Sequence, residues 1–207
     1  MSDSYTTLAA AATSSFVERR SEFIGNVMPV TDENSALSFI SGIKAKYSDA
    51  KHNVWAYILR DNNISRFSDD GEPHGTAGLP VLDVLRKSRI TDSAVVVTRY
   101  FGGILLGAGG LVRAYTKAAS DAVAAAGCKL IKQLCRISVT LSYQDNSKCE
   151  QIFALFECRI VDRVYAGDVT TMLLISPHDV ISLQKKLVDA TSGRAKLSTL
   201  CSEYGTL

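Results

Sequence analysis

Apolar and polar positions follow strand and helix periods along most of the chain, and they predict alternating strands and helices. Runs of alternating or β-branched side chains predict strands in the first part of the chain, at 22–30, 53–59, 64–68 and 94–100. Apolar positions at helical spacing predict helices, at 34–47, 80–87 and 110–126. Asp32 or Thr31 is placed to cap the first helix, and Gly127 to end the third.

After Gly127 the pattern restarts with a second series of elements. Strands are expected at 135–143, 159–166, 169–176 and 195–204, with helices at 145–157 and 179–190. The resulting order, βαββαβ, is typical of a ferredoxin-like split βαβ domain. We therefore expect an α+β protein with two domains. Its parts would be a loose arm over 1–20, an N-terminal domain over 21–130 and a ferredoxin-like domain over 135–207, with a linker near 127–134.

Composition restricts the classes of function. The chain has 207 residues, of which 46% are hydrophobic and 21% charged, so it can bury a core. Its formal net charge is only +2, which argues against an extended, nonspecific nucleic-acid binder but leaves room for a local basic patch. We expect no DNA specificity.

Cysteine usage and the N-terminus indicate the compartment. The five cysteines form no C-x-x-C pair, and we expect reduced, mostly buried thiols. Asp3 stands where a secretory signal carries basic residues, and the apolar run at 8–12 is too short for one. No stretch is long enough for a membrane span. These features predict a cytoplasmic protein that does not contact a membrane.

A glycine-studded segment between the strand at 94–100 and the following helix is the strongest candidate for a ligand site. Five glycines fall within nine residues: Gly102, Gly103, Gly107, Gly109 and Gly110. Such a loop allows close approach of a ligand, and the helix directs free N–H groups and a positive dipole toward it. The spacing matches neither the P-loop nor the dinucleotide fingerprint. Anion binding and simple packing of a tight turn therefore both remain open.

Cationic and aromatic side chains flank this loop. Arg99, Arg113 and Lys117 supply positive charge, and we expect Arg99 and Arg113 to converge on an anion there. Tyr100 and Phe101 are available to stack on an unpaired base.

The acidic segment 68–78 is the second candidate. Asp69, Asp70 and Glu72 lie within four residues, with His74 close by. Carboxylates in this arrangement could hold Mg²⁺ or support acid–base chemistry, but the same residues are also ordinary turn formers. Lys51 and His52 precede a strand and would line the same site only if the following hairpin brought them close, so we expect a solvated strand end.

Several of these segments together resemble the IMPACT/YigZ family. The resembling motifs lie at 21–25, 51–57, 68–73, 75–78, 99–103 and 106–115. The resemblance implies an N-terminal domain like the second domain of ribosomal protein S-five, a fold shared with domain IV of the translocation elongation factor. The C-terminal part resembles the second domain of the bacterial YigZ branch. Eukaryotic IMPACT members regulate translation, so the resemblance implies a role there.

The sequence therefore leaves three functions to weigh. The first is a non-enzymatic regulator of translation that binds RNA, a ribosome-associated surface or a nucleotide through the face formed by the two loops. The second is a Mg²⁺-dependent enzyme acting on a small phosphorylated substrate, with Asp69, Asp70 and Glu72 on the metal. The third is a protein-binding module. No residue stands out as a nucleophile.

Overall fold

The computed structural model describes residues 4–207, which divide into two compact units. The first unit covers 5–130 and the second covers 131–207 together with Ser4. The strands up to residue 100 are β1 (Ser4–Leu8), β2 (Ala12–Glu18), β3 (Ser21–Pro29), β4 (His52–Leu59), β5 (Ile64–Ser68) and β6 (Ser93–Tyr100). The helices of this unit are α1 (Glu33–Lys46), α2 (Gly78–Lys87) and α3 (Ala108–Ala126). Every helix and strand expected in this part of the chain is present.

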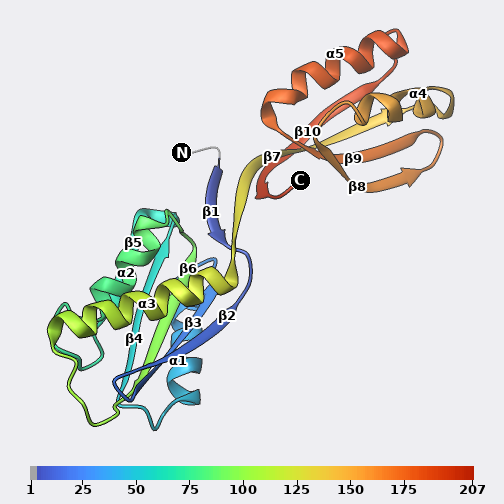
Figure 1. Cartoon of the computed structure of the whole chain (residues 1–207). Helices are drawn as coiled ribbons and strands as arrows, with labels where there is room; N and C mark the ends of the chain where they lie inside the picture. Colours follow the sequence, from blue (N-terminus) through green and yellow to red (C-terminus); the bar gives the residue numbers. More distant parts are fainter. Residues whose placement is uncertain (1–3) are drawn as a thin grey trace. The chain divides into compact units, whose positions relative to one another are not determined.

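The first unit is a twisted antiparallel sheet with helices on both faces (Figure 1). The strand order is β2-β3-β6-β4-β5. Strand residues alternate between the two faces, so Val95 and Val97 of β6 pack in the core under α2 and α3, while Ala94 and Val96 pack in the core under α1. The Asp32 side chain caps α1, as expected, by accepting a hydrogen bond from the Ser35 N–H at 2.8 Å.

The expected loose arm over 1–20 is wrong for the residues that the structure describes. β2 pairs with β3 along its whole length, and Leu8 of β1 is fully buried. The turn between β2 and β3 lies at Arg19 and Arg20, which both have positive φ, and this conformation is typical of a tight hairpin. The small and polar residues of β2 do not show the pattern of a strand. The reason is that β2 lies at the edge of the sheet and about half of its side chains face solvent.

The second unit follows the βαββαβ order. Its elements are β7 (Cys128–Leu141), α4 (Tyr143–Phe153), β8 (Cys158–Tyr165), β9 (Val169–Ile175), α5 (Val180–Thr191) and β10 (Lys196–Gly205). The strand order of its sheet is β1-β7-β9-β8, and β10 also pairs with β7. The pairs β10–β7, β7–β9 and β8–β9 are antiparallel. The boundary between the two units, at 130/131, lies inside the expected segment 127–134. The segment is not a separate linker, because β7 begins at Cys128, directly after the helix-ending Gly127.

Two further expectations concern the chain as a whole. No helix within residues 4–207 is long and apolar enough to cross a membrane. All five cysteines are free, but only Cys149 is buried, so the expectation of mostly buried thiols is wrong.

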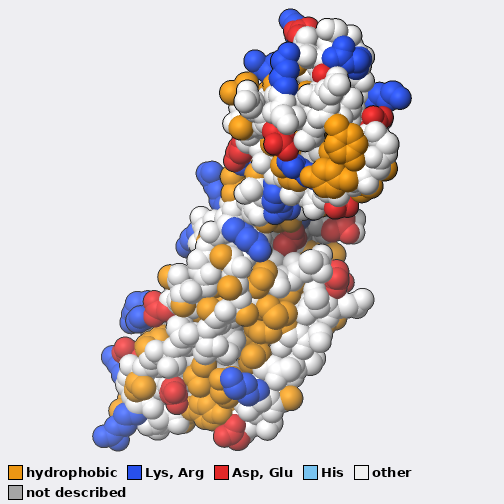
Figure 2. All heavy atoms as spheres, turned by 90° about the vertical axis from the view of Figure 1, so that its right-hand side faces the viewer, with side chains coloured by type: hydrophobic (Ala, Val, Ile, Leu, Met, Phe, Trp, Pro, Cys, Tyr) orange, Lys and Arg blue, Asp and Glu red, His pale blue; other side chains and the backbone are white. Residues whose placement is uncertain are grey.

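Positive and negative side chains are interspersed on the face shown in Figure 2, in keeping with the small net charge.

Gly25 allows α3 to lie directly on β3. A Cβ at this position would lie 2.5 Å from the Ala118 carbonyl oxygen and 3.0 Å from the Ala122 Cβ. We expect Gly25→Ala to lower the free energy of unfolding by about 1–3 kcal/mol through overpacking. Chemical denaturation provides the measurement. Gly42→Ala in α1, where nothing lies within 4 Å, is the control and should leave stability unchanged or slightly raised. An unchanged stability in Gly25→Ala would contradict this packing.

Asp69 holds the loop before α2, and its pKa makes this contribution depend on pH. Burial raises the pKa of Asp69, but hydrogen bonds from the Gly75, Gly78 and Ala77 N–H groups outweigh it, so the pKa lies below its ordinary value. A carboxyl whose pKa is lower in the folded state stabilises the protein above its unfolded-state pKa, and this stability is lost as the pH falls through the folded-state pKa.

We therefore expect Asp69→Ala to cost about 2 kcal/mol of unfolding free energy at neutral pH and much less in acid. Thermal unfolding measured from neutral to acid pH tests this. Asp61→Ala in the exposed turn before β5 is the matched control, with little expected effect at any pH. If Asp69→Ala lowered the unfolding free energy equally at neutral and at acid pH, the negative charge of Asp69 would not stabilise the loop.

Candidate functional site

The acidic segment and the glycine-rich segment line one cavity in the first unit. Its volume is about 410 Å³. The acidic segment contributes Gly71, Glu72 and Pro73, and β6 with the following loop contributes Arg99 and Phe101. The remaining lining residues come from the start of β4, the same loop and the first turn of α3; they are Lys51, His52, Leu105, Leu106, Gly107, Ala108 and Leu111. The walls are therefore mainly apolar, with a small set of charged groups.

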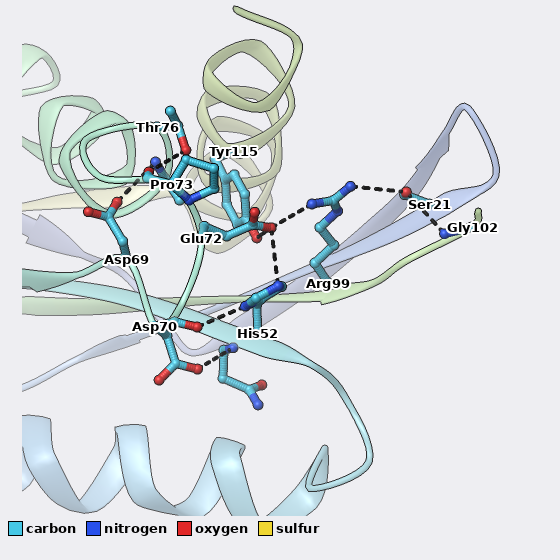
Figure 3. Close-up of polar contacts among 12 residues, drawn as sticks. Ser21, His52, Asp69, Asp70, Glu72, Pro73, Thr76, Arg99, Gly102 and Tyr115 are labelled. Carbon is cyan, nitrogen blue, oxygen red and sulfur yellow. Dashed lines mark hydrogen bonds and ion pairs between the residues drawn. The ribbon is translucent and has the colours of Figure 1, made fainter. Parts of the chain in front are cut away.

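A buried ion pair forms the polar floor of this cavity. The Arg99 Nη1 lies 2.6 Å from the Glu72 Oε1, and the two side chains are only 7% and 4% exposed. The Tyr115 hydroxyl of α3 donates a hydrogen bond to the same oxygen at 2.8 Å (Figure 3). Burial, and then the Glu72 carboxylate, raise the pKa of Tyr115 well above its ordinary value, so the phenol stays protonated and remains a donor.

Arg99 also ties the glycine-rich loop to the sheet. Its Nη2 lies 3.5 Å from the Ser21 Oγ, which in turn accepts a hydrogen bond from the Gly102 N–H at 3.2 Å. A Cβ on Gly102 would lie 2.0 Å from the Arg20 backbone, so only glycine fits there. The Arg99 Nε is buried and has no hydrogen-bond partner among the described residues. One N–H donor of the buried guanidinium is therefore left unused.

His52 lies beside this ion pair in a fixed orientation. Its Nδ1 is 2.8 Å from the Asp70 carbonyl oxygen, which can only accept, so Nδ1 carries a proton. Its Nε2 lies 4.0 Å from the Glu72 Oε1 (Figure 3). In the neutral imidazole this Nε2 is an acceptor. The expectation that His52 occupies a solvated strand end is wrong, because its side chain is 11% exposed and lines the cavity.

The other two carboxylates of the acidic segment hold the loop in shape. Asp69 accepts hydrogen bonds from the Gly75, Ala77 and Gly78 N–H groups. Asp70 accepts from the Asn53 N–H at 2.7 Å and pairs with Lys44 at 2.6 Å. Neither residue lines the cavity. Across residues 4–207, no three acidic, His or Cys side chains are grouped to hold a metal ion. The Mg²⁺ arrangement of Asp69, Asp70 and Glu72 is therefore unsupported.

Of the five glycines of the glycine-rich segment, Gly107 is the one that lines the cavity. Gly103 and Gly107 have φ of +83° and +72°, a conformation that favours glycine. Gly107 precedes α3 without a side-chain cap, so the first N–H groups of the helix have no side-chain partner there. The helix begins at Ala108 rather than near Gly110, so Gly109 and Gly110 lie in its first turn. A Cβ on Gly110 would lie 2.9 Å from the Leu106 Cβ.

Besides Asp69 and Asp70, the predicted site residues Tyr100, His74 and Arg113 lie away from the cavity. Tyr100 points to the other face of β6, where its hydroxyl donates to Asp49 at 2.7 Å. His74 is fully exposed beside Asp69. Arg113 lines a second hollow of about 230 Å³ together with Arg19 and Lys117. The expected convergence of Arg99 and Arg113 is therefore wrong.

Helix geometry accounts for the position of Arg113. Successive residues of an α-helix are about 100° apart, and Leu111, two positions earlier, is the one that lines the cavity. Leu106 borders both hollows, so the two adjoin at the glycine-rich loop. Sequence reasoning missed Tyr115 and the apolar wall at Leu105, Leu106 and Leu111. No local sequence pattern predicts that a tyrosine of a helix contacts a carboxylate in a distant loop.

Comparisons with known proteins assign the chain to a family. Residues 19–123 match the model of the Impact N-terminal domain, and residues 139–194 match that of a domain of unknown function, DUF1949. The chain is 34% identical to the IMPACT family member YvyE of Bacillus subtilis over 95% of its length and 91% of that protein. It is 31% identical to the IMPACT family member YigZ of Escherichia coli, over 86% of this chain and 89% of YigZ.

A solved structure supports the same assignment. A crystal structure described as that of a hypothetical protein is 29% identical and covers 97% of this chain and 99% of its own, with a TM-score of 0.63. The mixed helix-and-strand structure in two units agrees with the two matched domains. The resemblance seen in the sequence motifs is confirmed: this chain belongs to the IMPACT family.

Proposed function

We propose that this chain regulates translation by binding single-stranded RNA on its first unit. One unpaired base would enter the cavity between the acidic and glycine-rich segments. The neighbouring phosphates would lie over the adjoining basic hollow. The role in translation rests on the resemblance to IMPACT proteins, and the RNA-binding site rests on the form and chemistry of the two hollows.

The cavity is the observation that carries the proposal. Its volume of about 410 Å³ falls in the range of small-ligand sites and suits one base with its ribose. Phe101 lines the cavity and is 49% exposed, a suitable position for stacking on a base. The N–H groups of the first turn of α3, which have no side-chain cap, add donors for a ligand that carries acceptors.

The adjoining hollow supplies charge for a small number of phosphates. Arg19 and Arg113 are exposed there, and neither has a carboxylate partner among the described residues. Lys117 lies in the same hollow but is paired with Asp121. Glu18 also borders it, and the net charge of the chain is only +2. These features favour a short contact with a few phosphates over binding along an extended strand.

We also propose the two fold assignments that the resemblance implies. The order βαββαβ, with β10 beside β7 at one side of the sheet, supports a ferredoxin-like second unit. The four antiparallel strands β3, β6, β4 and β5 with their helices support a first unit like the second domain of ribosomal protein S-five. The same two folds follow each other in the translocation elongation factor. This analogy is consistent with a role in translation but is a weak argument for it.

The proposal predicts weak, salt-sensitive binding of single-stranded RNA. A labelled short RNA of mixed sequence, followed by fluorescence anisotropy with the full chain, should bind with a salt dependence equivalent to about two to four phosphates. The same sequence as a duplex should bind less well, because its bases cannot leave the stack to enter the cavity. Equal affinity for duplex and single strand would contradict the base-in-cavity model.

Arg113→Ala should weaken this binding and reduce the salt slope by about one phosphate. Stability should change little, because Arg113 is exposed. Lys185→Ala, an exposed cation on α5 in the second unit, removes the same charge and should leave binding unchanged. If both variants weaken binding alike, only overall charge is involved. If RNA does not bind at low salt, the proposal fails and a protein-binding function becomes the better explanation.

A further inference from the structure

We infer that the cavity selects guanine among the four RNA bases, an inference that rests on the proposed function and adds its specificity. It follows from the hydrogen-bonding character of the floor. The floor presents two acceptor groups, the Glu72 carboxylate and the His52 Nε2, which lies 4.0 Å from the Oε1 of that carboxylate (Figure 3).

Only one of the two oxygens of the Glu72 carboxylate accepts hydrogen bonds from the protein. Its Oε1 accepts from Arg99 at 2.6 Å and from Tyr115 at 2.8 Å. Its Oε2 has no protein donor in the part of the chain that the structure describes, and it is not among the fully buried atoms that lack a partner. Because Glu72 lines the cavity and the rest of its side chain is enclosed, the accessible surface of Oε2 faces the cavity.

The His52 imidazole provides the second acceptor. The Asp70 carbonyl fixes the proton on Nδ1, so Nε2 of the neutral ring has a free lone pair 4.0 Å from the Glu72 Oε1. Both side chains are buried, at 11% and 4% exposure, and their positions are held by contacts with the loop and with α3. A ligand group that contacts both Glu72 and His52 therefore has to bring two donors.

Among the RNA bases, only guanine carries two adjacent donors on its Watson–Crick edge, the N1–H and the N2 amino group. Adenine and cytosine place an amino group beside a ring-nitrogen acceptor, and uracil has one N–H between two carbonyls. Lys51 also lines the cavity, and its ammonium group would supply a donor for the guanine O6. Each of the other bases would place an acceptor against Glu72 or His52, and burying unpaired acceptors is unfavourable.

The test is a series of nucleoside monophosphates titrated into the full chain by isothermal calorimetry. GMP should bind about ten- to a hundredfold more tightly than AMP, CMP or UMP, which corresponds to the loss of one or two hydrogen bonds to charged groups. IMP, which retains N1–H and O6 but lacks the N2 amino group, should bind about tenfold more weakly than GMP. Equal binding of GMP and IMP, or of GMP and AMP, would overturn the inference.

Two variants separate recognition from general binding. Glu72→Gln replaces one acceptor oxygen by a donor amide and should remove the preference for GMP. Phe101→Ala should weaken the binding of all four nucleotides alike and keep the preference for GMP, because stacking does not distinguish the bases strongly. If Glu72→Gln does not fold, because Arg99 loses its ion pair, the comparison of GMP with IMP on the unaltered protein still decides.

Short RNA oligomers separate this inference from the function on which it rests. The probes are a uridine oligomer with one central guanosine and the all-uridine oligomer of the same length. Tighter binding of the guanosine-containing strand is expected. Equal binding of both strands overturns guanine selection and leaves RNA binding intact, whereas binding of neither overturns both. Binding of GMP without binding of either strand would identify a free-nucleotide site instead.

Discussion

The ion pair between Arg99 and Glu72 is the interaction on which the candidate site depends. It joins the end of β6 to the acidic loop, and both partners are almost completely buried. Removing one partner of such a pair leaves an uncompensated buried charge, which costs about 3–5 kcal/mol. Tyr115 from α3 donates to the same carboxylate, and His52 from β4 lies beside it. A single carboxylate thus brings together the four segments that enclose the cavity.

The three acidic residues that lie close together in the sequence have different roles in the structure. Asp69 holds the loop before α2 and Asp70 ties it to β4 and α1, both through hydrogen bonds or ion pairs that use their oxygens. Glu72 faces the cavity. The first two carboxylates are thereby held away from a shared metal position, and they fix the loop so that Glu72 meets Arg99. Rigid support of this kind is what a binding site with a few fixed polar groups requires.

Local periodicity predicted nearly all helices and strands, because these elements pack one face on a core and repeat at the expected spacing. It failed for β1 and β2, and β2 is a polar edge strand recognisable only from its pairing with β3. For the site, the sequence identified both loops, but it placed Arg113 and Tyr100 at the ligand. Their directions depend on where α3 begins and on which face of β6 each residue occupies, and neither follows from residue type. The positions of His52 and Tyr115 depend on contacts between distant segments.

The central claim is that an unpaired RNA base occupies the cavity of the first unit. Backbone amide NMR shifts of the full chain, followed during titration with a short guanosine-containing single strand, test it most directly. The account predicts that the largest shifts occur at Lys51, His52, Gly71, Phe101 and Gly107, with smaller shifts around Arg113 and none above background in 131–207. Shifts confined to the second unit, or spread evenly over surface lysines and arginines, would contradict it.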